Sequence, residues 1–84
     1  MSIAPQTLTR VEAIANTALD AGDEMAGTVT TTVNRAGAIT LAVAVYADHA
    51  DRLDYWVEQV RSEVAIARHR GRFTEPFAVV AATD

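Results

Sequence analysis

The 84-residue sequence predicts one small α+β domain, residues 1–84, with its elements in the order α-β-β-α-β. Three observations support this prediction. Apolar residues recur at helical spacing before residue 22 and again between residues 48 and 70. The spacing changes to alternation between residues 27 and 46, and a short β-prone apolar run, Phe77 to Ala82, follows the second helical stretch. We therefore expect a three-stranded sheet with two helices packed on one of its faces.

The first helix has two candidate starting points. Thr9-Arg10-Val11-Glu12 fits a capping box, in which the Thr hydroxyl and the Glu carboxylate bond to each other's backbone N–H groups. Pro5 fits the first helical position instead, which places the start about one turn earlier. At the other end, Gly22 stands where a left-handed residue would end the helix.

A β-hairpin is predicted after the first helix. Thr28 to Val33 are all β-branched, and such side chains fit a pleated surface better than a helix. Asn34 to Gly37 supply the turn, and the second strand runs from Ala38 to Tyr46. Large and small residues alternate along this second strand. The alternation predicts either close helix packing on the small side or burial of both sides.

Residues Asp48 to Arg70 predict a single long helix, which Gly71 ends. Acidic residues crowd its start and basic residues its end, which is the polarity that complements the helix dipole. The residues expected to face the sheet fall within a sector of roughly 100°. They are Leu53, Trp56, Val57, Val60, Val64 and Ala67.

The composition excludes several classes of protein. Half of the residues are apolar, which excludes disorder, but 17 of them are alanine, so the core is small and a self-associating surface is expected. The net charge of -4 has the wrong sign for binding DNA over the whole surface. The absence of cysteine excludes disulfides and thiolate zinc sites. The longest apolar run, Ala38 to Ala47, is about half the length of a membrane span, so we expect a cytoplasmic protein without direct membrane insertion.

We expect no catalytic residue, no metal site and no cofactor. His49 lies between Asp48 and Asp51, but acidic residues at a helix start are explained by the helix dipole. The two serines, Ser2 and Ser62, stand at the terminus and on an outward helix face, where no histidine would activate them. The glycines match no phosphate-binding loop, so the sequence indicates a non-enzymatic protein.

Two groups of residues are candidates for binding. The first is a segment of three arginines beside an aromatic ring, which can hold phosphate or stack on a base, although helix-dipole compensation also explains its charges. The second group projects from the back of the long helix and indicates a partner or self-association face. The first group is Arg68, Arg70, Arg72 and Phe73, and the second is Tyr55, Gln59, Ser62 and Ile66.

The second half of the chain combines several motifs. A strand (Ala38 to Tyr46) and a short acidic link precede a helix with regularly spaced valines (Val57 to Ala65). A glycine near the helix end (Gly71) and a closing strand whose last residues read Val80 to Asp84 follow. This combination resembles the alkaline shock protein family. The resemblance implies a non-enzymatic cytoplasmic protein of cell-envelope stress, held at the membrane by a separate anchoring protein and forming homo-oligomers.

Two other interpretations stay open. The order of elements also resembles the KH-like ribosome-maturation factors, which implies a small RNA-binding domain that uses Arg68 to Phe73 against phosphates. The absence of a Gly-x-x-Gly loop and the acidic net charge argue against nucleic acid as a partner. The third interpretation is a small phage or assembly component.

Overall fold

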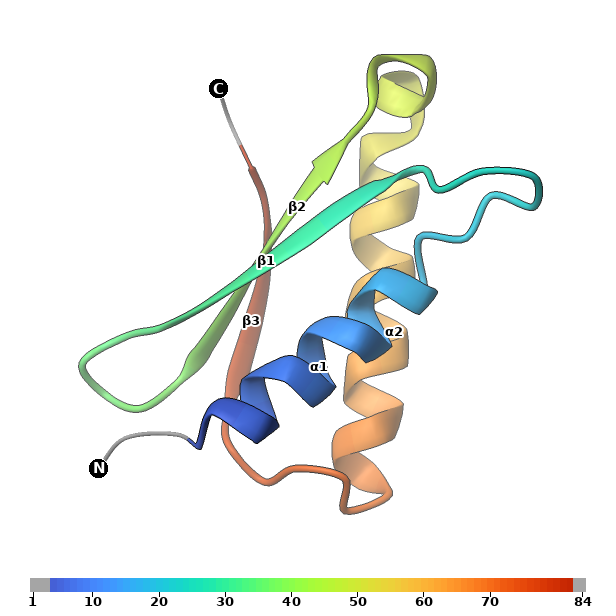
Figure 1. Cartoon of the computed structure of the whole chain (residues 1–84). Helices are drawn as coiled ribbons and strands as arrows, with labels where there is room; N and C mark the ends of the chain where they lie inside the picture. Colours follow the sequence, from blue (N-terminus) through green and yellow to red (C-terminus); the bar gives the residue numbers. More distant parts are fainter. Residues whose placement is uncertain (1–3, 83–84) are drawn as a thin grey trace.

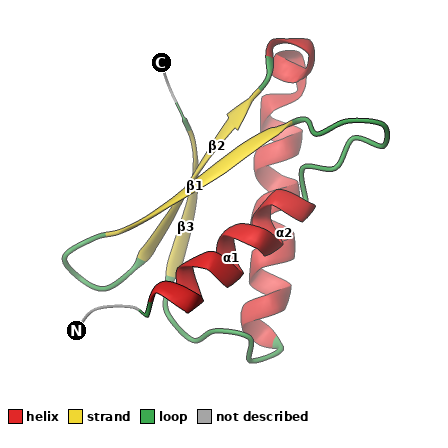
Figure 2. Ribbon diagram, in the orientation of Figure 1, coloured by secondary structure: helices red, strands yellow, loops and turns green. Residues whose placement is uncertain are grey.

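Two helices lie against one face of a three-stranded sheet in the computed structural model, which describes residues 4–82 (Figure 1). Figure 2 distinguishes the helices, in red, from the strands, in yellow. This arrangement confirms the predicted α+β class and the order α-β-β-α-β. The elements are α1 (Pro5–Thr17), β1 (Gly27–Val33), β2 (Ile39–Val45), the 3-10 turn η1 (Ala47–Arg52), α2 (Leu53–His69) and β3 (Phe77–Ala81).

The sheet is mixed, and β2 is its central strand. β1 pairs with β2 in antiparallel register, with Val29 opposite Val43, and β3 pairs with β2 in parallel register, with Val79 opposite Leu41. The predicted turn between β1 and β2 forms around Asn34, whose Oδ1 accepts hydrogen bonds from the backbone N–H groups of residues 36 and 38. The parallel pairing of β2 with β3 requires a long connection, which α2 provides.

The core lies between the helices and one face of the sheet. The large residues of β2 form its centre and have no exposed area, and the apolar stripes of both helices cover them. The indole Nε1 of Trp56 is buried and has no hydrogen-bond partner among the described residues. The largest fully buried side chains are Leu19, Ile39, Leu41, Val11, Val43, Val60 and Val64.

Helix α1 differs from the capping-box prediction at its start and from the Gly22 prediction at its end. It begins at Pro5, whose fixed φ suits the first helical turn, so the alternative start is correct and the capping box at Thr9 is wrong. It ends at Thr17. Gly22 has a φ of 97° in a separate turn, where its N–H donates to Asp20 Oδ1 at 2.9 Å.

The predicted single helix from Asp48 to Arg70 is divided into two parts. η1 forms a 3-10 turn, and α2 begins at Leu53, after Arg52 has adopted a φ of -119° and a ψ of 29°. Such tight turns are common at helix N-termini. Gly71, with a φ of 81°, follows the helix end as predicted. The core-facing prediction is confirmed by the buried residues Trp56, Val60, Val64 and Ala67, and Leu53 and Val57 are half-buried.

The small-residue side of β2 faces away from the helices. Ile39, Leu41 and Val43 are buried under α1 and α2, so the alternation of the strand turns Thr40 and Ala42 to the opposite face. Neither close helix packing on the small side nor burial of both sides is observed, and that prediction is wrong. Both α-helices within residues 4–82 cover the large side (Figure 1).

We expect a Val60→Ala variant to unfold more readily than a Val33→Ala variant. Val60 has no exposed area, whereas Val33 at the end of β1 is 37% exposed. The buried truncation loses apolar burial and leaves a cavity, which costs about 2 kcal/mol, and the exposed one costs less than about 1 kcal/mol. Denaturant unfolding followed by the fluorescence of Trp56, the one tryptophan in the sequence, measures both. Equal losses of stability would contradict this core.

Candidate functional site

The sheet face opposite the helices is uncovered in the part of the chain that the structure describes, and we call it the open face. Thr30, Ala42 and Val80 lie side by side across its centre, as the strand register shows. Val80 is 45% exposed. The open face therefore presents short side chains on a pleated surface. It consists of Thr28, Thr30, Thr32, Thr40, Ala42, Ala44, Ala78 and Val80.

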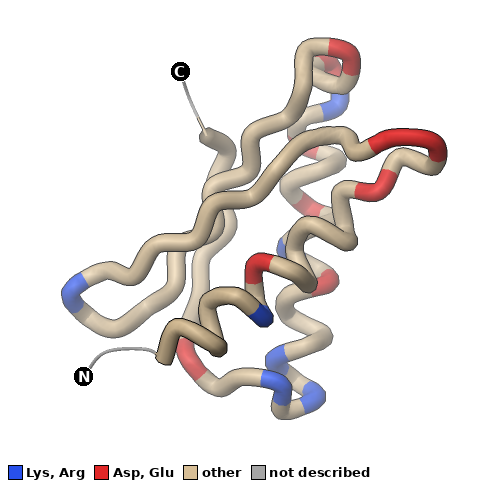
Figure 3. The backbone as a smooth tube through the Cα atoms, in the orientation of Figure 1, with Lys and Arg blue, Asp and Glu red and all other residues tan. Residues whose placement is uncertain are grey.

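The open face carries no charge. None of the residues in β1, β2 and β3 is charged, and the strands run uncoloured through Figure 3. A sheet face exposed to water ordinarily carries polar and charged residues. Charged side chains also protect sheets from unwanted association. The open face has threonine and alanine in these places, so it lacks the features that keep an exposed sheet solvated and separate.

The sequence contains a signal for the open face in the side chains of two adjacent strands. Thr28, Thr30 and Thr32 share one side of β1, and the register places them beside the small side of β2. The small residues of β2 alone predict either a helix-packing surface or burial of both sides of the strand. Two adjacent strands that carry threonine and alanine on the same side indicate an uncovered face instead, because a buried face needs large apolar residues.

The predicted contact residues on α2 are mostly exposed, but they do not form one apolar patch. Tyr55 and Ile66 are 44% and 46% exposed, and they stand 11 residues apart, roughly 16 Å along the helix. Between them Ser62 is exposed and Gln59 is half-buried. The Tyr55 ring packs edge-on against Trp56, with ring centres 4.9 Å apart, and the Arg52 guanidinium lies over it at 4.4 Å.

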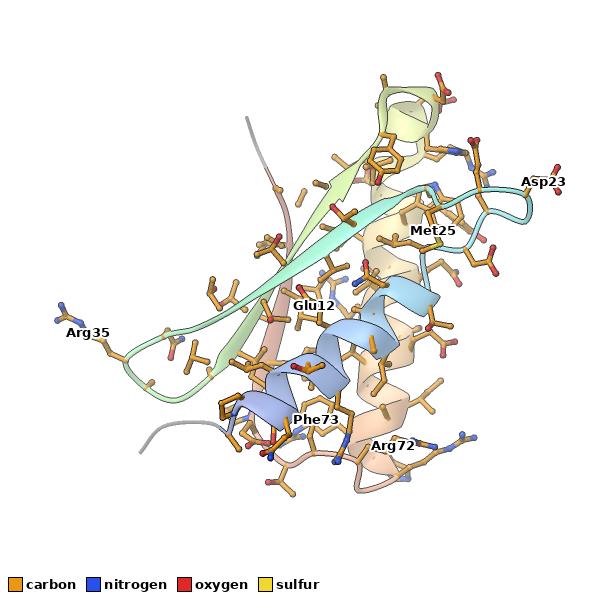
Figure 4. The ribbon with its side chains drawn as sticks, viewed as in Figure 1. Glu12, Asp23, Met25, Arg35, Arg72 and Phe73 are labelled. Atoms are coloured by element: carbon orange, nitrogen blue, oxygen red, sulfur yellow. The ribbon has the colours of Figure 1, made fainter. Side chains whose placement is uncertain are left out.

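The predicted basic segment divides into residues with different roles. Phe73 is only 4% exposed and packs against Phe77 with ring centres 6.0 Å apart, so its predicted role in stacking on a base is wrong. Arg68 Nε donates to the Glu75 carbonyl at 3.0 Å, and its Nη2 donates to the Thr74 carbonyl at 3.1 Å. Arg68 therefore holds the connection between α2 and β3 in place. Figure 4 shows Phe73 and the preceding Arg72 at this end of the molecule.

Arg70 and Arg72 line an open hollow between α1 and α2, with a volume of about 230 Å³. Ile66 of the predicted contact face lines the same hollow. The connection after α2 is fixed there by Arg10, whose Nη1 donates to the Arg72 carbonyl at 3.0 Å. The lining consists of Ile14 and Thr17 from α1, Glu63, Ile66 and Ala67 from α2, and Arg70 and Arg72.

Charge is separated along the molecule. Acidic residues gather on the loop after α1 and around η1, and arginines gather at the other end of α2 (Figure 3). At the acidic end, His49 Nε2 lies 3.0 Å from Glu24 Oε1, and its ring meets Trp56 edge-on at 6.1 Å. This pair joins the loop after α1 to η1. The hollow at the opposite end is therefore a locally basic site on an acidic chain.

Metal sites and membrane-spanning helices, on which the sequence analysis states expectations, are described only for residues 4–82. Over that range, no three His, Asp or Glu side chains gather where they could hold a metal ion. No helix in the same range combines the length and apolarity needed to cross a membrane. Ser2 and the closing Thr83 and Asp84 lie outside the described residues.

Comparisons of the chain with family models, with curated proteins and with solved structures find no match. Two surfaces of the chain are candidates for a functional site. They are the open face, formed by all three strands, and the hollow, which brings together side chains from α1, α2 and the connection to β3.

We expect an Arg68→Ala variant to be less stable than an Arg70→Ala variant. Arg68 makes two hydrogen bonds to carbonyls of the α2–β3 connection, whereas the Arg70 side chain makes no hydrogen bond or ion pair to another residue in the range 4–82. Loss of the Arg68 bonds lowers the free energy of unfolding by about 1 kcal/mol, and loss of the Arg70 side chain changes it by less than about 0.5 kcal/mol. Thermal or urea unfolding measures the difference. A larger loss in the Arg70 variant would contradict the assigned role of Arg68.

Proposed function

We propose that this chain is a non-enzymatic interaction and scaffolding domain that associates with copies of itself through the open face. The observation that carries the proposal is a sheet face that is uncovered, uncharged and built from threonine, alanine and valine. An exposed surface of this kind is typical of a contact between proteins, because water favours its burial and no charge opposes it.

The charge distribution favours a second copy as the occupant of this face. Each chain carries a net charge of -4, so two copies repel each other over most of their surfaces. The strands are without charge, so contact through the open face buries no ionised group. A strongly charged partner would gain nothing from this face.

The open face is also complementary to itself. With a two-fold axis parallel to β2, the open-face residues of β1 in one copy lie over the open-face residues of β3 in the other. Threonines then meet smaller or apolar residues. Thr30 then lies toward Ala78 or Val80 of the second copy. Short side chains on both copies allow the sheets to approach closely, which is the requirement for packing two sheets face to face.

The size of the face predicts a weak association. Three strands about 4.8 Å apart, two of seven residues and one of five, cover roughly 300 Å² of flat area, which is below the roughly 800 Å² per partner of a standard interface. The threonine hydroxyls also lose water on contact, which costs free energy. We therefore expect a dimer whose population rises with protein concentration rather than a permanent assembly.

The cellular setting of this scaffold follows from the resemblance of Ala38 to Asp84 to the alkaline shock protein family. We propose a cytoplasmic protein of cell-envelope stress that reaches the membrane through a separate anchoring protein.

We do not propose RNA binding, because Phe73 is buried and Arg68 is hydrogen-bonded to the chain itself. Only Arg70 and Arg72 of the basic segment are then left for a ligand, and they lie beside Glu63.

We expect a Thr30→Glu, Val80→Glu double variant to be monomeric at concentrations where the wild-type chain dimerises. The two residues lie on either side of Ala42 at the centre of the open face, so self-association would bury four carboxylates. Light scattering after gel filtration, at several protein concentrations, measures the mass. The matched control is a Gln6→Glu, Ala13→Glu variant, which adds the same charge on exposed positions of α1 and should keep the wild-type mass.

A third variant tests the contact face predicted from the sequence. A Tyr55→Glu, Ile66→Glu variant places the same charges on the outer surface of α2. The proposal expects this variant to dimerise like the wild type. Monomers in this variant together with dimers in the Thr30→Glu, Val80→Glu variant would move the contact from the sheet to α2, and a monomeric wild type at all concentrations would end the proposal.

A further inference from the structure

We propose that the hollow between α1 and α2 binds the C-terminal residue of a partner polypeptide, with a free carboxylate and an apolar side chain. A C-terminal residue presents three groups close together: a carboxylate, a backbone N–H and a side chain. The hollow presents a matching group for each of them. This inference concerns a different surface from the open face and does not depend on self-association.

The carboxylate is matched by Arg70 and Arg72. Neither side chain makes a hydrogen bond or an ion pair with another residue between positions 4 and 82, so both guanidinium groups are available. Arginine binds carboxylates through paired N–H donors, and such charge-assisted bonds are stronger than neutral ones. The hydrogen bond from Arg10 to the Arg72 carbonyl fixes this segment to α1 and brings a third guanidinium close to it.

The backbone N–H is matched by Thr17 and Glu63. Thr17 Oγ1 uses its proton in a 2.9 Å bond to the Ala13 carbonyl, so its oxygen is left as an acceptor. Glu63 lines the same hollow and supplies carboxylate acceptors. The negative charge of Glu63 repels anionic groups, and this repulsion acts on several phosphates of an RNA backbone but on only one carboxylate of a C-terminal residue. The hollow therefore selects a ligand with a single carboxylate and an adjacent donor.

The apolar side chain is matched by Ile14, Ile66 and Ala67. Ile66 is 46% exposed although it lies beside the half-buried Ile14 and the buried Ala67, so the three form an uncovered apolar surface. Burial of this surface by a ligand is favourable in proportion to the area removed from water. A volume of about 230 Å³ is large enough for one side chain of the size of leucine.

The experiment titrates the chain with N-acetyl-leucine and follows its backbone amide signals by NMR, which detects weak binding in a 9.0 kDa protein. We expect saturable shifts at residues 14, 17, 66, 70 and 72. N-acetyl-leucinamide has no charge and should bind at least about tenfold more weakly. Sodium acetate, which has no side chain, and 4-methylpentanoate, which has no backbone N–H, should also bind more weakly.

Variants separate the hollow from general attraction to arginine. An Arg70→Gln, Arg72→Gln variant should lose the shifts, and an Arg35→Gln variant, altered in the turn between β1 and β2, should keep them. The monomeric Thr30→Glu, Val80→Glu variant should also keep them, so failure of the open face and failure of the hollow are distinguishable.

Each of the other results would overturn the proposal. Equal binding of acetate would reduce the hollow to an unspecific anion contact. Equal binding of 4-methylpentanoate would assign it to free carboxylic acids instead of polypeptides. An absence of saturable shifts would remove the site altogether.

Discussion

The alternation of large and small residues along β2 determines which surfaces this protein offers. β2 is the central strand, so its two sides form the middle of both faces of the sheet. Ile39, Leu41 and Val43 are fully buried under the two helices. Because successive strand residues point to opposite faces, the packing that buries these three side chains also turns Thr40, Ala42 and Ala44 outward. The open face is therefore a direct consequence of how the core is built.

The elements with strong local signals could be predicted from the sequence. The β-branched run before Asn34 and the turn around it define the hairpin, and Gly71 follows the second helix with the positive φ that glycine accepts. The start of α1 was ambiguous, because Pro5 and the capping box at Thr9 are both good local signals. The division at Arg52 had no local signal, and its geometry appears only in the folded chain, where His49 reaches Glu24.

The hollow could not be predicted, because its residues come together only through packing. Ile14 and Thr17 are about fifty positions away from Ile66 and Arg70 in the sequence, and no local pattern joins them. The basic segment shows the same difficulty within one short stretch. After the end of α2, the chain turns so that Phe73 enters the core and Arg72 reaches the hollow, although the two residues are neighbours in sequence. Sequence alone grouped them as one binding segment.

The two surfaces are placed so that they do not compete. The helices cover one side of the sheet, and the hollow is lined by residues of those helices and the connection that follows them, whereas the open face lies on the other side of the sheet. A copy bound to the open face therefore leaves the hollow accessible. The proposed self-association and the proposed binding of a C-terminal residue are therefore compatible in one chain.

The most direct test of this account is the reactivity of single cysteines at two neighbouring positions of β2, in a chain that otherwise has none. Val43 has no exposed area, and Ala44 is exposed on the open face. At low protein concentration, a thiol reagent should label the Ala44→Cys variant in the native state and the Val43→Cys variant only after unfolding. Labelling of Ala44→Cys should slow as the protein concentration rises and a second copy covers the open face. Rapid native labelling of Val43→Cys, or protection of Ala44→Cys at every concentration, would contradict the account.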